Sequence, residues 1–446
     1  MASNQTQSQN TNQKIRIGII GGGPAGLTSA LALEAYVNNS SVEVVLFDKN
    51  KSVIDYPGVE YGIQERACRA LDRIGIKERA LRRGVRAHRI EFFNSRLQRQ
   101  FRSIKSDPDN TRCVVRQEFL TDLEDLVSDA DIRMQHKVVK VSQSSQNNVV
   151  LEIDRSDGSK LTEEFDVVIA CDGSFSTVRR QFFPESADKI DQGFSCIYML
   201  LEPSEPAAAD ERYLRLANGG TSQLMMGRNS TLTLFPLGAN RLAYGIGFDH
   251  ATKQRLWADN ELSYDTDWTE VSSETRKSIA TALTEDACPH DSLYSQSLSY
   301  VSDWESYKIY LWKMQDTDAL DDPYIRGRNV VLIGDAAHAL MPTIGMGASL
   351  AIEDAERLAR RIADCINMTA SAEAFREGFT KSVAEPYSEV RAPIWTELIR
   401  RARLAAKENF INQSERKRFA IGPAIPNDTL SRIVSAIESM ARKIGV

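Results

Sequence analysis

Residues 14–48 read KIRIGIIGGGPAGLTSALALEAYVNNSSVEVVLFD, and this stretch decides the fold. The apolar run Ile15–Ile20 predicts a buried strand that leads directly into a G-x-G-x-x-G turn, and apolar residues at helical spacing follow the turn. A second β-rich run, Val42–Phe47, ends on Asp48. Strand, glycine turn, helix, strand and acid in this order are the sequence context of a dinucleotide-binding fingerprint. The stretch therefore predicts a Rossmann-like unit that binds an adenosine dinucleotide.

The residues of the turn have separate tasks in such a unit. The first glycine permits the tight turn, the second lets a pyrophosphate approach bare backbone, and the third lets the helix pack closely on the strand. N–H groups at the start of the helix then face the phosphates, and the acid accepts hydrogen bonds from a ribose diol. The expected cofactor contacts are Gly21, Gly23, Pro24, Ala25, Gly26 and Asp48. The turn alone does not distinguish FAD from NAD(P).

Composition limits the class of protein. A chain of 446 residues is long enough for two or more domains, and a net charge of −6 gives no global electrostatic reason to bind nucleic acid. No run reaches the ~18 apolar residues that a membrane span needs. Six cysteines without paired spacing favour a reduced, intracellular chain without a metal cluster. The polar residues 1–13 predict a disordered tail without a targeting signal, and we expect a cytoplasmic monomer or homodimer.

The pattern of apolar and polar residues changes twice along the chain. Residues 14–192 and 315–366 carry buried strands and helices, which predicts one discontinuous Rossmann-like domain. Between them, residues 193–314 form an inserted domain with a mostly antiparallel sheet, because short runs alternate apolar and polar residues. Those runs are CIYMLLEP, YLRLA, SQLMMGR, STLTLFPL, RLAYGIGF and YKIYLWKM. The expected fold class is therefore α/β (α+β) with two domains.

Two other segments complete this organisation. Residues 62–105 belong to the range of the Rossmann-like domain, but we expect them to contribute to the substrate side of the protein. Residues 367–446 are predicted to be mainly helical, and the apolar stripe from Leu430 to Ile444 predicts a terminal helix docked on the core.

Two further motifs follow buried strands. The run Phe165–Ala170 ends in CDGSFSTVR, where Asp172 needs hydrogen-bond donors and Arg179 is available to pair with it or with a phosphate. The run Val330–Ile333 ends in GDAAHALMPTIGMGAS, where Asp335 stands at the carboxyl end of a strand. Ligands bind at this end of the strands in open α/β sheets.

In this order, GGGPAG with Asp48, CDGSFSTVR and GRNVVLIGDAAHALMPTIGMGASLAIEDA resemble the single-component (group A) flavoprotein aromatic hydroxylases, the family of p-hydroxybenzoate and salicylate hydroxylases. The resemblance covers the chain to about Leu358 and implies the p-hydroxybenzoate hydroxylase-like fold. It also implies FAD as the cofactor, NADPH or NADH and O2 as co-substrates, and hydroxylation of a phenolic or indolic small molecule through a C4a-hydroperoxyflavin. The absence of a second G-x-G-x-x-G fits, because NAD(P)H has no domain of its own in this family.

The resemblance also implies roles for single residues. The aspartate of the third motif binds ribityl or ribose hydroxyls, the glycine loop after it lies over the isoalloxazine ring, and the next helix points its N–H groups at the flavin. The residues implied in cofactor binding are Arg116, Asp172, Asp335, Pro342, Gly345, Gly347 and Ala348. His338 matches a common family residue, and we interpret it as structural. Glu65 and Arg66 replace the Pro-Asn of many salicylate-hydroxylase-like members, so no substrate preference transfers.

The substrate is expected between the antiparallel sheet and the flavin. The candidate lining residues are Leu224, Met226, Phe235 and Tyr244, with the Pro342 loop as a roof and Tyr244 or Arg228 as the group that polarises a phenol. Alternation alone does not decide which face of each strand points inward. Epoxidation or Baeyer–Villiger oxidation on the same fold, and a flavin-binding protein without oxygenase activity, stay open as alternatives.

Overall fold

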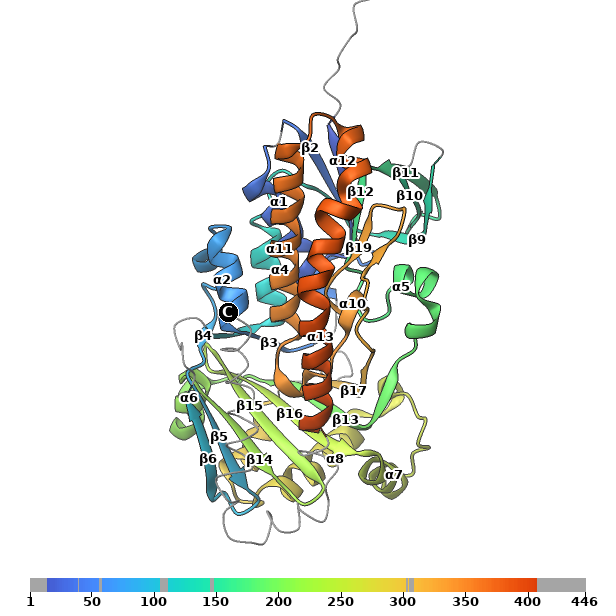
Figure 1. Cartoon of the computed structure of the whole chain (residues 1–446). Helices are drawn as coiled ribbons and strands as arrows, with labels where there is room; N and C mark the ends of the chain where they lie inside the picture. Colours follow the sequence, from blue (N-terminus) through green and yellow to red (C-terminus); the bar gives the residue numbers. More distant parts are fainter. Residues whose placement is uncertain are drawn as a thin grey trace, which may run out of the picture.

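Two sheets of different character lie one above the other in Figure 1, and helices pack against each of them. The computed structural model describes residues 14–38, 40–55, 58–104, 111–144, 148–301, 304 and 309–406. The tail expected at residues 1–13 and the stripe expected from Leu430 to Ile444 lie outside these residues. Within the described ranges, no helix combines the length and the apolar character needed to cross a membrane.

The first sheet has six strands in the order β18-β19-β12-β1-β2-β8. Its strands are β1 (Ile15–Ile20), β2 (Val42–Phe47), β8 (Asp131–Arg133), β12 (Val167–Ala170), β18 (Tyr324–Ile325) and β19 (Val330–Leu332). Neighbouring strands run parallel, except for the antiparallel pair of β18 and β19. Strand β12 is buried at every position, which explains its unbroken apolar sequence. The Rossmann-like fold class expected from the sequence is confirmed.

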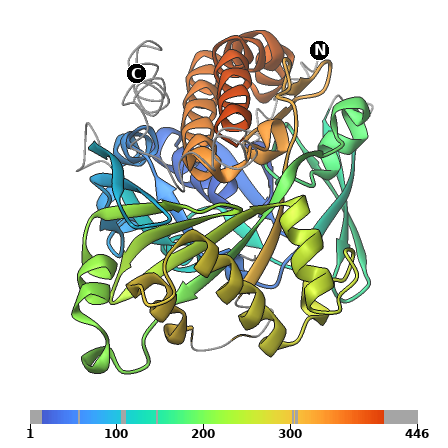
Figure 2. The same cartoon turned by 90° about the horizontal axis from the view of Figure 1, so that it is seen from below.

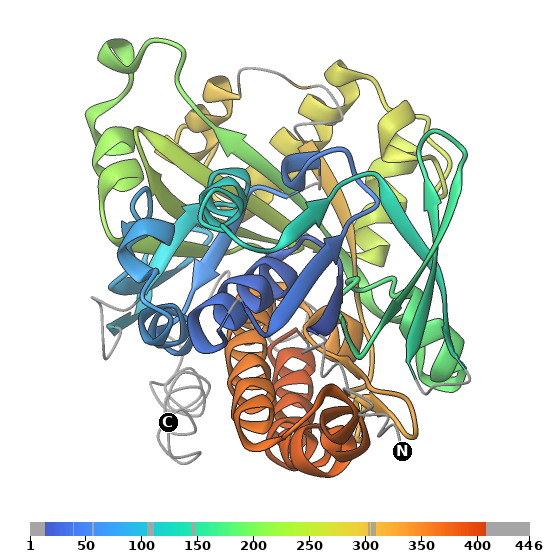
Figure 3. The same ribbon diagram turned by 90° about the horizontal axis from the view of Figure 1, so that it is seen from above.

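Helices cover this sheet in layers. Helix α1 (Pro24–Tyr36) packs along α11 (Gly347–Met368), and α13 (Glu385–Ala406) lies beside α11 (Figures 1 and 3). The other helices of this part are α2 (Glu65–Arg73), α3 (Lys77–Ala80), α4 (Arg116–Glu124), α5 (Thr177–Phe182), α10 (Asp335–His338) and α12 (Ala372–Phe379). Two three-stranded sheets accompany them, with the strands β9 (His136–Gln143), β10 (Val149–Arg155) and β11 (Lys160–Phe165), and β3 (Glu60–Ile63), β4 (Val85–Arg86) and β7 (Arg112–Val115).

The second large sheet has seven strands in the order β17-β13-β16-β15-β14-β5-β6. Its strands are β5 (Arg89–Asn94), β6 (Arg99–Ile104), β13 (Ile190–Leu201), β14 (Thr221–Met226), β15 (Ser230–Gly238), β16 (Arg241–Asp249) and β17 (Ile309–Asp316). All neighbours are antiparallel except β5 and β14, which run parallel. Strands β5 and β6 come from the stretch before the insertion and extend this sheet at one edge.

Each face of the second sheet has a different neighbour. The helices α6 (Glu211–Asn218), α7 (His250–Asp259), α8 (Ser273–Ala287) and α9 (Leu293–Gln296) lie on one face, in front of the strands in Figure 2. The opposite face meets β3 and β7, where Phe235 packs near Val59 and Val115. We call this opposite face the inner face, because it turns toward the first sheet.

One predicted strand is wrong. The run Tyr213–Ala217 was expected to be a strand of the insertion, but it lies in helix α6. Asp210 caps this helix by accepting a hydrogen bond from the N–H of Arg212 at 2.7 Å. Over five residues, apolar positions fit period two and period 3.6 almost equally, so the cap and the helix-forming Glu, Arg, Leu and Ala residues decide the outcome.

Candidate functional site

The three sequence motifs leave the first sheet at neighbouring points. Ile20 at the end of β1 is the register partner of Ala170 at the end of β12, and Ala170 is the partner of Leu332 at the end of β19. The turns that follow these strand ends carry Gly23, Asp172 and Asp335. Parallel strands end at the same edge of a sheet, so the three turns share one edge, which we call the strand-end site.

The glycines of the first turn leave space at one position only. Gly21 has a φ of +108°, and a Cβ there would lie 2.4 Å from the carbonyl oxygen of Cys171. A Cβ on Gly26 would lie 1.8 Å from the carbonyl oxygen of Gly21. A Cβ on Gly23, by contrast, would meet nothing within 4 Å. The turn is thus closely packed on both sides of Gly23, and the open backbone at Gly23 is where a pyrophosphate can approach.

The start of α1 adds donors to this open space. Gly23 is the N-cap and offers no side chain to the first-turn N–H groups, and Pro24 follows it at the first helical position. No acidic residue lies in the first turn. Helix starts of this kind leave N–H groups for an anion, and the helix dipole favours negative charge there.

Asp48 lies at the end of β2 and is only 2% exposed. Its Oδ2 accepts a hydrogen bond from the N–H of Gly22 at 2.6 Å, and its Oδ1 accepts one from the N–H of Asn50 at 2.8 Å. The carboxylate therefore fixes the glycine turn directly. Its expected contact with a ribose diol stays a prediction.

Asp172 has one engaged oxygen and one that has no partner. Its Oδ2 accepts a hydrogen bond from the N–H of Thr177 at 2.7 Å at the start of α5. Its Oδ1 is buried and has no hydrogen-bond partner among the described residues. Burial raises the pKa of this carboxyl, and the hydrogen bonds it accepts oppose that effect. An orphaned acceptor at the strand-end site fits a hydroxyl-bearing ligand.

Arg179 does not take the partner expected for it. The sequence suggested Asp172 or a phosphate, but the guanidinium, 2% exposed, donates to the carbonyl oxygen of Ala337 at 2.8 Å and to that of Asp318 at 2.6 Å. Burial lowers its pKa to about 10. Arg179 thus ties α5 to α10, the short helix that begins at Asp335.

Asp335 stands in a concave part of the surface. Its side chain is exposed, yet the protein around it raises the pKa of the carboxyl by desolvation, while His338 and Lys189 lower that pKa. Gly334 precedes it with a φ of +58°, and a Cβ on Gly334 would lie 3.3 Å from the Cβ of Ala25. The Asp335 turn therefore lies against the start of α1, and both border the same space.

The glycine loop after α10 borders this space from another side. Pro342 and Gly345 are exposed, and Gly345 adopts the left-handed conformation with a φ of +60°. Gln64 Nε2 donates to the carbonyl oxygen of Gly345 at 3.3 Å, and α11 begins two residues later at Gly347 and Ala348. The loop thus presents backbone to solvent beside a helix start, as a flat ring system requires.

Arg116 begins α4 and is 7% exposed. Its Nε donates to the hydroxyl of Tyr61 at 2.8 Å, and its guanidinium carbon lies 5.5 Å from the centre of the Tyr61 ring. Gly58, with a φ of +134°, lets the arginine pass, because a Cβ there would lie 2.8 Å from Arg116 Cδ. The role of Arg116 beside a ribityl chain stays a prediction.

The register of the second sheet sorts the expected substrate residues. Leu224 pairs with Thr233, and Phe235 lies two residues beyond Thr233, so Leu224, Met226 and Phe235 share the inner face. Their contact with a substrate stays a prediction. Tyr244 pairs with Leu234 and therefore points to the opposite face.

Of the two residues expected to polarise a phenol, Tyr244 is wrong, and Arg228 stays a prediction. Tyr244 is fully buried under the helices, where its hydroxyl contacts Thr284 Oγ1 at 3.2 Å and donates to the carbonyl oxygen of Tyr294 at 3.1 Å. Arg228 is exposed in the hairpin turn between β14 and β15, next to Asn229, which bonds to Asp286 of α8. Tyr244 thus lies on the side of the helices, because the strand register and not the residue type decides the face.

Sequence reasoning missed two aromatic residues and one acid. Tyr198 and Tyr310 are register partners on β13 and β17, and both pack with Phe235 on the inner face. Tyr198 also packs against a cluster that contains Met314 and Met341, and Leu340 and Ile344 beside the glycine loop pack against the same cluster. We call Tyr198, Tyr310 and Phe235 the aromatic face. Alternation in CIYMLLEP and YKIYLWKM was the available signal, but it does not give the side.

Gly245 makes room for this aromatic face. A Cβ on Gly245 would lie 2.8 Å from Tyr198 Cε1 and 2.6 Å from Thr233 Oγ1, so the Tyr198 ring covers the bare backbone of β16. Glu60 on β3 adds an acid whose charge raises the pKa of Tyr198 and of Cys196, after the larger effect of burial. Burial raises the pKa of Glu60 itself to about 7.

The strand-end site with its open glycine, its acids and its glycine loop defines a dinucleotide-binding flavoprotein with the two-sheet fold. A protein-family profile described as an FAD binding domain matches residues 14–401, and the chain belongs to this FAD-binding family. The resemblance to single-component flavoprotein monooxygenases and the expectation of FAD are confirmed.

Relatives and solved structures agree with this assignment. The dual trans-enoyl reductase/FAD-dependent monooxygenase tazHJ of Aspergillus terreus is 24% identical over 86% of this chain, which spans 53% of that protein. The 3-amino-4-hydroxybenzoate 2-monooxygenase of Streptomyces cremeus is 24% identical over 89% of this chain and 88% of its own length. HpxO of Klebsiella pneumoniae, solved with FAD and uric acid, has the same fold, with a TM-score of 0.68, 18% identity and 91% of each chain covered. The enzyme class expected from the sequence, an FAD-dependent monooxygenase, is confirmed.

Proposed function

We propose that this chain uses NADPH or NADH and O2 to hydroxylate an electron-rich aromatic small molecule, phenolic or indolic, beside its FAD. One observation carries the proposal: the strand-end site, which fits FAD, lies on the side of the molecule that the aromatic face of the second sheet meets. Tyr198 connects the two, because it packs against the buried cluster that Tyr310 and Phe235 also contact. It packs as well against a second cluster, which Leu340 and Ile344 beside the glycine loop also contact.

The strand-end site supplies a separate contact for each part of FAD. The pyrophosphate fits the bare backbone at Gly23 and the start of α1. The ribityl hydroxyls fit the exposed carboxylate of Asp335 and the orphaned Oδ1 of Asp172. The ring fits the backbone of the exposed Gly345 and of the half-buried Gly347. When bound, FAD supplies the hydride-accepting and oxygen-activating chemistry of the reaction.

The aromatic face would hold the substrate and exclude water, which the cofactor cannot do by itself. Aromatic rings offer flat apolar walls for a planar substrate, and they keep water away from reactive oxygen chemistry. In this proposal Glu60 exchanges a proton with the phenol, because burial raises its pKa to about 7, near the pH at which a base is both present and effective. Leu224 and Met226 lie on the same face and continue the wall.

The names of similar proteins support the class of substrate. The Streptomyces relative acts on an aminohydroxybenzoate, and the Klebsiella structure contains uric acid. Both are planar, electron-rich ring compounds. We therefore favour hydroxylation of a nitrogen- or oxygen-substituted ring over epoxidation or Baeyer–Villiger oxidation.

The test uses the purified full chain reconstituted with FAD. Candidate phenols and indoles are screened for faster NADPH or NADH consumption, and products formed under ¹⁸O2 are analysed by mass spectrometry. A product that gains one ¹⁸O atom supports the proposal. Faster nucleotide consumption with hydrogen peroxide alone rejects that compound as a substrate. FAD binding without stimulation by any member of a broad aromatic panel rejects the proposal in favour of a flavin-binding protein of another activity.

A further inference from the structure

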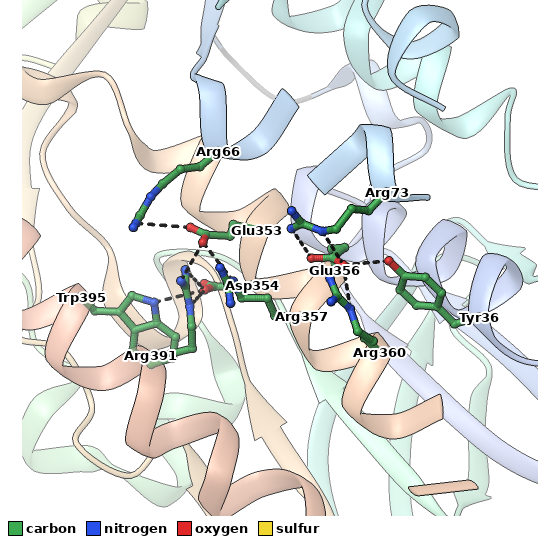
Figure 4. A network of polar contacts seen from close by, with 10 residues as sticks. All are labelled: Tyr36, Arg66, Arg73, Glu353, Asp354, Glu356, Arg357, Arg360, Arg391 and Trp395. Atoms are coloured by element: carbon green, nitrogen blue, oxygen red, sulfur yellow. Dashed lines mark hydrogen bonds and ion pairs between the residues drawn. The ribbon is translucent and has the colours of Figure 1, made fainter. Parts of the chain in front are cut away.

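A single buried carboxylate joins the Asp335 turn to the helix α13. Asp354 of α11 is fully buried, and its two oxygens have different partners. Its Oδ2 accepts hydrogen bonds from Nε2 of His338 at 2.6 Å and from the N–H of Gly334 at 3.3 Å. Its Oδ1 accepts from Nε of Arg391 at 2.8 Å and from Nε1 of Trp395 at 3.2 Å, and Figure 4 shows both partners on α13.

The partners of Oδ2, Gly334 and His338, lie on either side of Asp335 in the sequence and fix its position. Gly334 directly precedes Asp335 and has a φ of +58°, a conformation that glycine permits and that residues with a side chain rarely adopt. His338 ends the short helix α10 that Asp335 begins, and it is fully buried with its ring 4.5 Å from that of Trp395. One carboxylate oxygen thus holds both ends of the segment that presents Asp335 to the strand-end site.

The Oδ1 partners make this anchor depend on α13. A fully buried carboxylate is stable only beside a counter-charge, and Arg391, also fully buried, supplies it at 2.6 Å. Burial opposes the ionisation of Asp354, but Arg391 and His338 together lower the pKa of its carboxyl below the ordinary value. The charge that holds the Asp335 segment is therefore maintained from α13.

Helix α13 also reaches the glycine loop on the far side of the same space. Thr343 Oγ1 donates to the carbonyl oxygen of Ala402 at 2.9 Å. Thr343 lies in the loop whose backbone faces the ring of the cofactor. Helix α13 is thus connected to the Asp335 segment through Asp354 and contacts the glycine loop at Thr343. It does so although it begins more than 40 residues after Asp335 in the sequence.

We propose that Asp354 is a positioning residue of the FAD site, through which α13 sets the Gly334–Asp335 turn and so the affinity for FAD and the environment of its ring. The inference rests on FAD binding at the strand-end site and not on the identity of the substrate. It assigns Asp354 no contact with FAD, because every oxygen of the carboxylate is engaged by protein donors.

The same helix offers a matched control. Glu356 of α11 has a fully buried side chain, and Figure 4 shows it beside Asp354 with its own set of donors. It accepts hydrogen bonds from the hydroxyl of Tyr36 at 2.7 Å and from Nε of Arg73 at 3.0 Å, and it pairs with Arg360. These partners lie on α1, α2 and α11, so Glu356 holds helices together without touching the Asp335 segment.

The experiment compares Asp354→Asn with Glu356→Gln in the full chain. Apoprotein of each variant is titrated with FAD by flavin fluorescence, at a temperature where thermal unfolding curves show both variants folded, and the visible absorption spectrum of bound FAD is recorded. We expect Asp354→Asn to raise the dissociation constant of FAD about tenfold or more and to change the spectrum. Glu356→Gln should lower Tm about as much as Asp354→Asn does, because each removes a buried charge. It should nevertheless leave the dissociation constant of FAD within about twofold of the wild type.

Two results overturn the proposal. One is unchanged FAD affinity in Asp354→Asn, and the other is a loss of affinity that follows the loss of Tm equally in both variants. If Asp354→Asn does not fold, Trp395→Phe decides, because it removes one donor to Oδ1 and keeps an aromatic ring beside His338. Weaker FAD binding and a changed spectrum in Trp395→Phe then support the proposal, and wild-type values reject it. Normal FAD binding with no hydroxylated product would instead reject the proposed function and leave this inference intact.

Discussion

Gly334 and Ala25 stand side by side: a Cβ on Gly334 would lie 3.3 Å from the Cβ of Ala25. The first belongs to the turn that presents Asp335, and the second to the first turn of α1. Their proximity brings the turn proposed to bind the pyrophosphate beside the turn proposed to bind the ribityl chain. The predictions below follow from this arrangement and from the aromatic face opposite it.

Gly23 and Gly26 should respond in opposite ways to the same substitution. Gly23→Ala adds a methyl group into open space, so the apoprotein should keep its Tm, but the methyl group blocks the pyrophosphate. A lost hydrogen bond to a charged group costs about 1.5–3 kcal/mol, so the dissociation constant of FAD should rise about ten- to hundredfold. Gly26→Ala puts a Cβ 1.8 Å from the carbonyl oxygen of Gly21 and should prevent folding. Fluorescence titration and thermal unfolding measure both; a Gly23→Ala protein with wild-type FAD affinity would contradict the assignment.

Asp335→Asn should weaken FAD binding without unfolding the protein. The carboxylate is exposed and no side chain of the described residues bonds to it, so its loss removes a cofactor contact and little else. A charged hydrogen bond of about 1.5–3 kcal/mol corresponds to a dissociation constant raised about ten- to hundredfold. Asp318→Asn is the control, because Asp318 is an exposed acid nearby that pairs with Arg403. Equal FAD affinity in the two variants would argue against Asp335 as a ligand.

Gly245→Ala tests the aromatic face through a residue that a substrate cannot touch directly. The added Cβ would lie 2.8 Å from Tyr198 Cε1, so the ring must move toward the first sheet. We expect kcat/KM for the hydroxylated substrate to fall while FAD affinity stays within about twofold of the wild type. Unchanged kcat/KM would show that Tyr198 does not border the substrate.

Tyr244→Phe should affect stability and not substrate. Its hydroxyl bonds to Tyr294 and contacts Thr284 under the helices, so the change should lower the free energy of unfolding by about 1–2 kcal/mol. Steady-state kinetics should match the wild type, because Tyr244 faces away from the strand-end site. A raised KM in Tyr244→Phe would restore the role that the sequence first suggested for it.

Glu60 should make the apoprotein less stable as pH rises. Its pKa is about 7 in the fold, against an ordinary value of 4.5, so between these values the folded chain holds a proton that the unfolded chain has lost. Stability falls with pH wherever the folded state binds more protons. Tm should therefore decline between pH 4.5 and 7, and Glu60→Gln should remove that part of the decline. Parallel Tm curves for Glu60→Gln and wild type across this range would show that another group titrates.

Local sequence was sufficient for the first sheet and its turns. The strands Ile15–Ile20 and Val42–Phe47 have the expected bounds, and the expected helix follows the glycine turn, because apolar runs and a glycine turn are local signals. The strand predicted for Tyr213–Ala217 was wrong, because five residues are too few to distinguish the period of two of a strand from the period of 3.6 of a helix. The partner predicted for Arg179 was wrong, because Arg179 binds backbone carbonyl oxygens. Every residue carries a carbonyl oxygen, so the sequence does not indicate which of them an arginine binds.

By itself, then, the sequence indicated an adenosine dinucleotide site, because the glycine turn and the acid after the second strand have a chemistry that local sequence shows. FAD and the monooxygenase class followed from the resemblance that three motifs in order carry. Only the tertiary structure decided which residues lie on the inner face of the second sheet and which partners hold the segment around Asp335 in place. The face of a strand depends on register with its neighbours, which puts Tyr244 under the helices and Tyr198 and Tyr310 on the inner face. The bond between Asp354 and Arg391 depends on two helices packing together, and neither residue shows that pairing in its own stretch of chain.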